Sequence, residues 1–475
     1  MRLASWLAQR RAETTIAIEW PGGAWRFADW EHAARAEAQS LAPQAGVVAI
    51  LAGGIEFATA FLGVLLAGGT ALPLNQRLTL AELLPQLRRA GARHLWIEAG
   101  DPRAAELQAA LPELRVRVIG SASAAPSLDA PVPRVAETLV LLYTSGTSGA
   151  PKAVRLSEAQ FAASAEATLA RLGDAALGRW LACMPLFHIG GLSILMRGLI
   201  LGAPIRLLPR FEVEAVAAEL ARGDIAAVSL VPTMLQRLLA TRRGQRAPAG
   251  LRVLLLGGAA AAPALIADAL AQGYPVCPTY GLTEACSQVA TGAPPAGNPW
   301  RATPMRALPG LSLRIVHAGA LQPPGTVGEI EVAGPTVMQG YLDDPEANAR
   351  ALRAGWLATG DLGWIDAEGG LHVLDRREDL ILSGGENVYP AEVEAVLLLH
   401  PDVLEAGVCA AADADLGQRV EAHVVLRQGA DWDPARLTQH CRQHLAGYKL
   451  PRRWHQHPAL PRNAAGKLLR RGLGG

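Results

Sequence analysis

The chain has 475 residues, which is ample for a large hydrophobic core with a smaller additional domain. Half of the residues are hydrophobic, 18% are charged and the formal net charge is +1, so global charge favours neither nucleic acid nor an anionic membrane as a partner. Five scattered cysteines without a CxxC pair argue against a disulfide framework or a zinc site and fit the reducing cytoplasm. Residues 1–20 contain no long apolar segment typical of a secretory signal, which favours the same location.

The most apolar stretch of the chain lies at residues 192–208. It is interrupted by arginine, glycine and proline, so it predicts a buried helix and strand rather than a membrane span.

Short apolar runs alternate with amphipathic stretches in the first half of the chain. Strands are expected at residues 46–51 and 70–74, each followed by a helix, at residues 55–67 and 80–90. The same alternation continues through the apolar run at residues 251–256. This pattern is typical of parallel sheets covered by helices.

The hydrophobic pattern changes near residue 309. Residues 311–316, 328–332 and 370–374 alternate with a period of two between glycine and proline turns, which predicts an antiparallel β module. A smaller α+β region is expected after it, with helices at residues 390–399 and from residue 434, and strands at residues 405–411 and 420–426. We therefore expect two domains, at residues 1–377 and 378–475.

Residues 143–152 read YTSGTSGAPK and directly follow an apolar run. Hydroxyl groups, glycines that free the backbone and one lysine form the kind of loop that holds a polyphosphate. This segment therefore predicts a phosphate-binding loop at the end of a buried strand.

The P-loop of NTPases is the obvious alternative for this segment. It needs a glycine before its lysine and a serine or threonine after it, followed by a helix. Here Pro151 precedes Lys152 and Ala153 follows it, and the next residues alternate like a strand. The next helix is expected to begin at Ser157, with Gln160 completing a capping box. The loop therefore lies between two strands and is free to move over a phosphate.

Three further segments combine glycine with polar residues, and each has an ordinary structural explanation when taken alone. Glu284, next to Thr283, is suited to hold Mg²⁺ against phosphate oxygens, but it also suits the start of a helix. The aspartate of residues 359–361 is able to accept the hydroxyls of a ribose, but aspartate is common in turns. The two glycines of residues 383–387 allow a backbone to approach a ligand, or simply form a tight turn.

Two more candidates are a lysine and a histidine. Lys467 lies in NAAGK near the end of the sequence, where it either neutralises a developing phosphate charge or belongs to a solvated basic segment. His188 lies among apolar residues before two glycines, and such a histidine is more often a core residue than a catalyst.

The order of these segments is more informative than any one of them. The chain contains, in this order, YTSGTSGAPK, PLFHIGGL, YGLTE, GWLATGDLGWID, DRREDLILSGGENVYPAEVE and PRNAAGK. Over nearly its whole length it resembles the adenylate-forming superfamily of acyl- and aryl-CoA synthetases, luciferases and peptide-synthetase adenylation domains. The resemblance implies an α/β fold with a large N-terminal domain, made of two doubly wound αβ subdomains and a β-barrel, and a small mobile α+β C-terminal domain.

The resemblance also implies a reaction in two halves. A carboxylate first attacks the α-phosphate of ATP to give acyl-AMP and pyrophosphate, and a thiol then displaces AMP. ATP, AMP, Mg²⁺ and coenzyme A are the implied cofactors and substrates. Charge neutralisation at the α-phosphate requires Mg²⁺ and lysine.

The nucleotide-binding residues are carried over from the family motifs. The expected cofactor contacts are Thr144, Ser145, Gly146, Thr147, Lys152, Gly257, Gly258, Ala259, Tyr280, Gly281, Asp361 and Arg376. Among them, Asp361 and Arg376 are expected to hold the ribose.

The catalytic residues are carried over in the same way. Glu284 is expected to bind Mg²⁺, with Thr283 on the α-phosphate and Lys467 as the adenylation lysine. His188 matches the gate near the acyl pocket, and Glu378 matches the hinge of the C-terminal domain. Residues expected to serve the thiol and CoA are Gly384, Gly385 and Lys449.

Within the superfamily the chain is most similar to the o-succinylbenzoate–CoA ligases of menaquinone synthesis. The similarity lies in residues 73–78, 188–199, 280–291 and 383–394. A dicarboxylate substrate needs a cationic or hydroxyl partner for its non-reacting carboxylate. Arg197, Ser193 and Ser287 are the candidates, although Arg197 equally suits an exposed helix position.

Three alternatives to a 2-succinylbenzoate ligase remain open. The chain could activate another aryl or medium-chain acid, because a few side chains change the substrate of such pockets. It could load a carrier protein, but residues 448–451 resemble the region that meets CoA in ligases. A non-catalytic nucleotide-binding protein is disfavoured because Lys152, Glu284, Asp361 and Lys467 are all retained. The family is often dimeric, which leaves a homodimer open.

Overall fold

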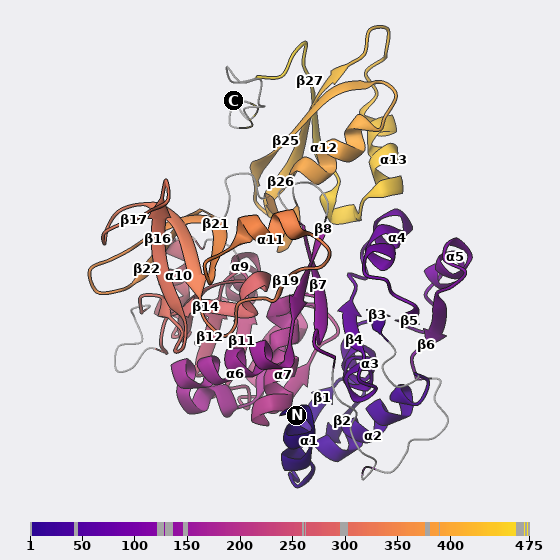
Figure 1. The fold of residues 1–475 in the computed structure, drawn as a ribbon. Helices are drawn as coiled ribbons and strands as arrows, with labels where there is room; N and C mark the ends of the chain where they lie inside the picture. Colours follow the sequence, from indigo (N-terminus) through magenta and orange to yellow (C-terminus); the bar gives the residue numbers. More distant parts are fainter. Residues whose placement is uncertain are drawn as a thin grey trace. The chain divides into compact units, whose positions relative to one another are not determined.

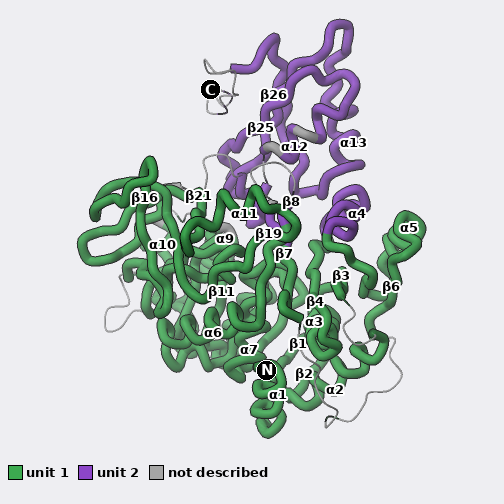
Figure 2. The backbone as a smooth tube through the Cα atoms, viewed as in Figure 1, with its two compact units in different colours: residues 1–76, 90–142, 153–376 green, residues 77–89, 143–152, 377–475 purple. Residues whose placement is uncertain are grey.

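The computed structural model describes residues 2–41, 46–120, 128, 136–145, 151–258, 261, 263–294, 303–375, 381–388, 390–461, 470 and 473 (Figure 1). The chain forms two compact units (Figure 2). Unit 1 contains residues 1–76, 90–142 and 153–376, and unit 2 contains residues 77–89, 143–152 and 377–475. The predicted domain boundary after residue 377 falls in a segment outside the described residues and stays a prediction.

The first sheet has the strand order β19-β8-β7-β4-β3-β5-β6. Its strands are β3 (Val47–Leu51), β4 (Thr70–Pro73), β5 (His94–Ile97), β6 (Arg115–Val118), β7 (Val140–Ser145), β8 (Pro151–Leu156) and β19 (Gly340–Tyr341). The helices of this region are α2 (Phe27–Ala38), α3 (Gly54–Leu66) and α5 (Arg103–Ala110), whereas α4 (Leu80–Arg89), which follows β4 in the sequence, belongs to unit 2. Strands β3 to β6 pair in parallel, so the predicted strand–helix alternation is confirmed.

The second sheet has nine strands in the order β15-β14-β13-β12-β11-β9-β10-β1-β2. They are β1 (Ile16–Trp20), β2 (Gly23–Arg26), β9 (Trp180–Ala182), β10 (Ile205–Leu207), β11 (Ala227–Leu230), β12 (Val253–Leu256), β13 (Val276–Leu282), β14 (Ser287–Thr291) and β15 (Arg306–Ala307). The helices of this region are α1 (Arg2–Arg11), α6 (Glu158–Leu172), α7 (Ile189–Leu201), α8 (Val213–Ala221), α9 (Pro232–Thr241) and α10 (Pro263–Ala271), with short 3₁₀ helices η1 (Gly173–Leu177) and η2 (Thr283–Ala285).

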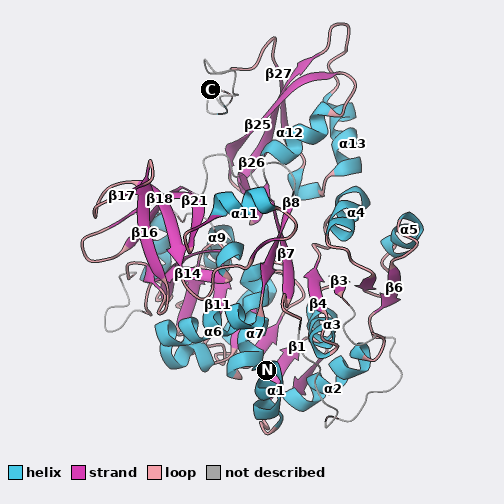
Figure 3. Ribbon diagram, in the orientation of Figure 1, coloured by secondary structure: helices cyan, strands magenta, loops and turns pink. Residues whose placement is uncertain are grey.

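Both faces of the central strands β9, β11 and β12 are buried, which explains why their sequences are almost entirely apolar. Trp180, Ala227 and Val253 point into one core cluster, which also contains residues of α6 and α7. Their neighbours Leu181 and Val228 point into another, which contains residues of α8, α9 and α10. Figure 3 shows the helices in cyan and the strands in magenta. The predicted helix and strand in the apolar stretch are α7 and β10. No helix in the described part of the chain is long and apolar enough to cross a membrane.

The antiparallel module predicted after residue 309 is confirmed. Its sheet contains β16 (Ser312–His317), β17 (Ala320–Leu321), β18 (Gly328–Ala333), β20 (Leu352–Arg353), β21 (Trp356–Ile365) and β22 (Leu371–Asp375). Helix α11 (Pro345–Ala351) lies between β19 and β20 in the sequence. All strand pairs of this sheet are antiparallel.

Unit 2 carries the predicted C-terminal α+β region. Its sheet contains β23 (Ile381–Ser383), β24 (Glu386–Val388), β25 (Val403–Asp413), β26 (Gly417–Leu426) and β27 (Arg453–Gln456). Its helices are α12 (Pro390–Leu398), α13 (Pro434–His444) and the 3₁₀ helix η3 (Gly447–Lys449). One face of the sheet packs Val408, Val420 and Val424 into a core cluster that includes Leu397 of α12 and Leu437 of α13.

Candidate active site

The phosphate-loop candidate joins two neighbouring strands, as its sequence predicts. Strand β7 ends at Ser145 and β8 begins at Pro151, so Thr144 and Lys152 lie on the strand ends. Helix α6 follows β8, and the backbone N–H of Ser157 donates to Gln160 Oε1 at 2.6 Å, which confirms the predicted capping box. A strand after the lysine, in place of a helix, excludes the P-loop arrangement.

Glu284 lies in η2, in the turn between β13 and β14. The hydroxyl of Tyr341 donates to its Oε1 at 3.0 Å, and the backbone N–H of Met338 donates to its carbonyl at 2.8 Å. Within the described chain only Oε1 of this half-buried carboxylate is hydrogen-bonded, which leaves Oε2 for a ligand. A carboxylate held in this way fits Mg²⁺, which prefers oxygen ligands. Thr283 begins the same 3₁₀ turn.

Asp361 lies on β21 and is only 5% exposed. The hydroxyl of Tyr280, on β13, donates to Asp361 Oδ2 at 2.7 Å. Thr359 Oγ1 accepts the backbone N–H of Asp361 at 3.1 Å and donates to the carbonyl of Ile330 at 2.7 Å. Two predicted nucleotide residues that are far apart in the sequence therefore form one hydrogen-bonded pair.

The glycines beside these residues allow close backbone contacts. A Cβ atom on Gly257 would lie 2.6 Å from the carbonyl oxygen of Thr279, and one on Gly281 would lie 1.9 Å from that of Ser287. Gly258 has a φ of +81°, a left-handed conformation that favours glycine. Packing of the backbone alone therefore requires glycine at these positions, whatever ligand they contact.

His188 is the N-cap residue of α7, and its ring lies 4.5 Å from that of Phe187, centroid to centroid. The first turn of α7 packs closely against the backbone of Pro185 and requires glycine at position 191, because a Cβ atom there would lie 2.3 Å from the Pro185 carbonyl oxygen. The ring of His188 is half-buried.

The three candidates for a second carboxylate come together. Arg197 lies on α7 and is only 3% exposed, so it is not a surface residue of the helix. Its Nη1 donates to Ser193 Oγ at 3.3 Å, and the hydroxyl of Ser287, on β14, donates to the same oxygen at 3.3 Å. The guanidinium lies over the ring of Trp180, 4.4 Å from its centroid.

The charge of Arg197 lacks an anionic partner among the described residues. Burial lowers the pKa of its guanidinium to about 10, so the group remains a cation at neutral pH. Its Nε is buried and has no hydrogen-bond partner in the described chain. A buried cation with an unused donor fits an anionic ligand group.

Unit 2 contains the remaining described candidates. Gly384 and Gly385 form the turn between β23 and β24 with φ values of 60° and 84°. The Nζ of Lys449 is buried and contacts Glu82 Oε1 at 2.8 Å and Glu392 Oε1 at 2.7 Å. Burial alone would lower the pKa of Lys449, but Glu392, the Tyr448 hydroxyl and Glu82 outweigh burial and raise it. The ammonium group is thus held by two carboxylates of its own unit.

Several predicted site residues lie outside the described residues, or have a side chain outside them. They are Ser145 (side chain only), Gly146, Thr147, Ala259, Arg376, Glu378 and Lys467. Their assigned roles stay predictions.

Sequence reasoning missed the residues that position the candidates. The sequence motifs do not include three of these positioning residues, which are Tyr341 on Glu284, Trp180 beneath Arg197 and Glu82 on Lys449. No sequence motif marks these residues, because each one meets its partner only when distant parts of the chain pack together. Tyr341 lies in QGYLDDP, where nothing points to Glu284 57 residues earlier, and Trp180 lies in a strand whose apolar pattern is typical of core.

Comparisons with known proteins agree with the motif order. Residues 5–342 match the AMP-binding enzyme family, and residues 392–467 match the AMP-binding enzyme C-terminal domain. The 2-succinylbenzoate–CoA ligase of Geobacillus kaustophilus (strain HTA426) is 42% identical over 482 residues, which cover 99% of this chain and 97% of that protein.

Solved structures show the same likeness. A double mutant of o-succinylbenzoate CoA synthetase from Bacillus subtilis, bound with its product analogue, has a TM-score of 0.91 at 36% identity and covers 98% of this chain and 97% of its own. The same enzyme in complex with ATP and magnesium ion has a TM-score of 0.73 at 36% identity, with 99% of both chains covered. The chain therefore belongs to the family of AMP-binding enzymes, with a large N-terminal domain and a separate C-terminal domain.

Proposed function

We propose that this protein is an ATP-dependent 2-succinylbenzoate–CoA ligase, which converts 2-succinylbenzoate, ATP and CoA into 2-succinylbenzoyl-CoA, AMP and pyrophosphate. The acid and the thiol come from the relatives, which carry this name at 37–42% identity over nearly the full chain. The observation that carries the proposal is the buried Arg197, whose charge and free Nε donor fit the second carboxylate of this substrate.

The first half-reaction forms the acyl-adenylate. An oxygen of the substrate carboxylate bonds to the α-phosphorus of ATP, and the bond to the pyrophosphate oxygen breaks. Glu284, held by Tyr341, is suited to bind Mg²⁺, which when present neutralises charge on the phosphates. Asp361, fixed by Tyr280 and Thr359, is suited to accept the ribose hydroxyls of the nucleotide.

The second half-reaction forms the thioester. The thiol of CoA loses its proton to solvent as its sulfur bonds to the acyl carbon, the carbon–oxygen bond to AMP breaks, and AMP leaves with the electron pair on its phosphate oxygen. We assign Gly384, Gly385 and Lys449 to this half by resemblance. The carboxylates around Lys449 give this lysine a structural role as well.

The acid pocket is expected to distinguish a dicarboxylate from a simple aryl acid. The reacting carboxylate belongs at the nucleotide, so the second one is available to Arg197, Ser193 and Ser287. An acid without the second carboxylate would leave the buried guanidinium unpaired, which is unfavourable in a low-dielectric site.

The test is the release of AMP by the purified protein with Mg²⁺, ATP and CoA. We expect release with 2-succinylbenzoate, accompanied by an equal amount of its CoA thioester, and little release with benzoate, coumarate or hexanoate. Release with one of these other acids, but not with 2-succinylbenzoate, would show that the chain is a CoA ligase for another aryl or medium-chain acid. Formation of a thioester only on a carrier protein would indicate a carrier-loading adenylation enzyme.

We propose a cytoplasmic location for the reaction, where ATP and CoA are available. All five cysteines are unpaired and buried, which fits a reducing compartment. A homodimer stays a proposal from the resemblance, and size-exclusion chromatography with light scattering tests it.

A further inference from the structure

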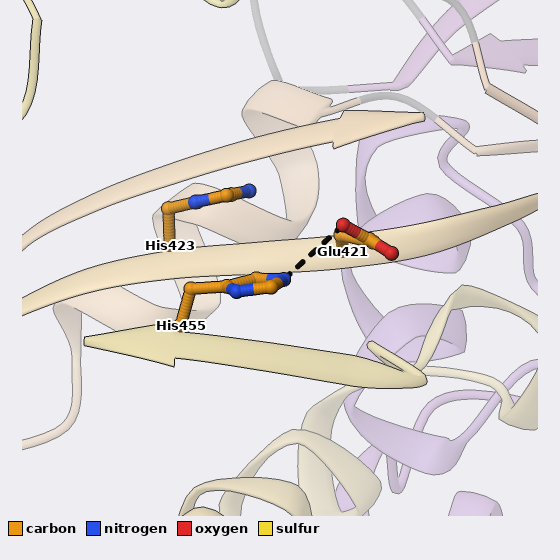
Figure 4. Close-up of side chains that lie close together, drawn as sticks. All are labelled: Glu421, His423 and His455. Carbon is orange, nitrogen blue, oxygen red and sulfur yellow. Dashed lines mark hydrogen bonds and ion pairs between the residues drawn. The ribbon is translucent and has the colours of Figure 1, made fainter. Parts of the chain in front are cut away.

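A cluster of histidines with one glutamate lies on the sheet of unit 2. Glu421 and His423 project from the same face of β26, because they are two residues apart. His455 of β27 lies directly opposite His423 in the parallel pair, and Cys409 of β25 lies opposite Glu421 in the antiparallel pair. Three strands thus bring these side chains together, and Figure 4 shows Glu421, His423 and His455.

The potential ligand atoms of Glu421, His423 and His455 all lie within 4.8 Å of one another. The Nε2 of His455 lies 3.2 Å from Glu421 Oε2. A tetrahedral Zn²⁺ ion with bonds of about 2.0–2.1 Å places its ligand atoms about 3.3 Å apart. Small side-chain rotations are therefore enough to close the three atoms around an ion.

Other residues orient this cluster in the way that supports metal binding. Nδ1 of His423 lies 2.9 Å from Nε2 of His457, so a hydrogen bond there leaves Nε2 of His423 for a ligand. Arg419 Nε donates to Glu421 Oε1 at 2.8 Å, which turns the other oxygen toward His455. Metal-binding histidines and carboxylates are commonly fixed by such outer hydrogen bonds.

Burial and access also suit an ion. His423 is only 2% exposed, so this potential ligand lies in the interior of unit 2. The side chain of His455 is 40% exposed, which gives an ion a route from solvent. The Cys409 thiol lies 3.4 Å from His423 Nε2 in a weak hydrogen bond, which an ion at this nitrogen would replace.

We propose that Glu421, His423 and His455 form a binding site for a divalent transition metal ion, and that Zn²⁺ is the ion it fits best. Two imidazole nitrogens and one carboxylate oxygen suit Zn²⁺, whereas Mg²⁺ and Ca²⁺ prefer sites made only of oxygen. The bound ion would fasten β27 to β26 and stabilise unit 2. This site is separate from Glu284, and the proposal does not depend on the acid that the enzyme activates.

The competing explanation is a cluster held by hydrogen bonds alone, since the existing contacts already pair His455 with Glu421 and His423 with His457. Zinc titration of the full-length protein decides between them. The protein should carry no polyhistidine tag, be stripped with a chelator and then be titrated with ZnCl₂ against a chromophoric chelator. We expect one Zn²⁺ per chain at this site and a higher unfolding temperature with zinc.

The variant His455→Ala removes a half-exposed ligand with little effect on the core, and should weaken zinc binding by at least roughly 100-fold. The variant His423→Gln should do the same, and circular dichroism checks that both remain folded. His444→Ala is the matched control, because it removes a histidine of α13 in the same unit that packs at a tilted angle against the ring of His440 rather than in the proposed site. Its zinc affinity should equal that of the wild type.

Two results would overturn the proposal. One is a wild-type protein that binds no zinc after stripping. The other is equal zinc affinity in the wild type and in His455→Ala, or a loss of binding in His444→Ala instead. The ligase assay is read separately, so failure of the zinc site leaves the proposed ligase function unaffected.

Discussion

Arg197 is the single residue on which the choice of acid rests most directly. The sequence places it in an apolar helix, where it suits either a surface or a pocket. The structure buries it against Trp180 and Ser193, and burial lowers its pKa without removing its charge. A buried guanidinium offers a planar pair of donors that a carboxylate matches, and lysine cannot reproduce this geometry.

Replacement of Arg197 by lysine tests this interpretation. The change keeps the charge but loses the paired hydrogen bonds, which are worth about 1.5–3 kcal/mol with a charged partner. We expect kcat/KM for 2-succinylbenzoate to fall roughly 10-fold to 100-fold, mainly through KM for the acid, while KM for ATP changes little. Steady-state kinetics with each substrate varied in turn measures this effect.

The control for this variant is Arg237→Lys, which alters an arginine over the ring of Phe211 in the same unit. It should leave the kinetics unchanged. If Arg197→Lys retained the wild-type KM for the acid, the second carboxylate would bind elsewhere.

Tyr280 is expected to act by positioning Asp361 for the nucleotide. The variant Tyr280→Phe removes a hydrogen bond of 2.7 Å to a buried carboxylate, worth about 1.5–3 kcal/mol because the acceptor is charged. We predict a rise in KM for ATP of roughly tenfold to 100-fold, with KM for the acid unchanged. Tyr274→Phe, which removes a tyrosine hydroxyl bonded to Arg242, is the control and should not change KM for ATP. Equal effects of both variants on KM would contradict the positioning role.

At the scale of elements, the turn between β13 and β14 organises the nucleotide side of the site. Gly281 lets the backbone approach Ser287 closely, and Cys286 and Ser287 adopt φ values of 53° and 94° that non-glycine residues rarely take. This strained turn carries Glu284 in η2 and leads directly into Ser287 at the start of β14. The close backbone contact at Gly281 permits only glycine there, and this restriction is one reason why the YGLTE motif is recognisable in the sequence.

The second element-scale feature is the buried contact of α4 and α12 with η3 in unit 2. Glu82 of α4 and Glu392 of α12 share the ammonium group of Lys449. We predict that Lys449→Met lowers the free energy of unfolding of unit 2 by about 3–5 kcal/mol, because two buried carboxylates lose their counter-charge. Denaturant unfolding followed by hydrogen exchange in residues of unit 2 measures this loss.

Arg436→Met is the control in the same unit, since Arg436 pairs with Asp402 at 2.9 Å on the surface. It should cost less than about 1 kcal/mol, as exposed ion pairs do. A similarly small effect of Lys449→Met would mean that the buried triad is not needed for the stability of unit 2.

At the scale of the whole molecule, the two half-reactions are expected to depend on different residues. Lys467, which lies outside the described residues, is assigned to adenylation by resemblance. We predict that Lys467→Ala reduces acyl-AMP formation by at least roughly 100-fold, because the charge developing at the α-phosphate loses its cation. Thioester formation from supplied acyl-AMP and CoA should remain close to wild type.

Single-turnover assays of each half-reaction measure this difference. Lys152→Ala provides a comparison within the phosphate loop, and it should also affect adenylation more than thioester formation. If Lys467→Ala slowed adenylation and thioester formation equally, the assignment of Lys467 to adenylation alone would be wrong.

The sequence alone determined the class of the protein and most of its elements. Hydrophobic periodicity predicted the parallel sheets, the antiparallel module and the C-terminal α+β region, because burial of one or both faces leaves a repeating pattern along the chain. The ordered motifs predicted the family and the candidates Glu284, Asp361 and Lys152. These motifs are visible in the sequence because turns and phosphate-binding loops are formed by residues that are neighbours along the chain.

Only the tertiary structure decided how these residues are held and what else the chain carries. The contacts of Tyr280 with Asp361 and of Tyr341 with Glu284 join residues 81 and 57 positions apart. The burial of Arg197 and the meeting of His423 with His455 depend on which strands and helices pack together. Side-chain contacts across such separations leave no pattern in one sequence, because they arise from the packing of whole elements rather than from neighbouring residues.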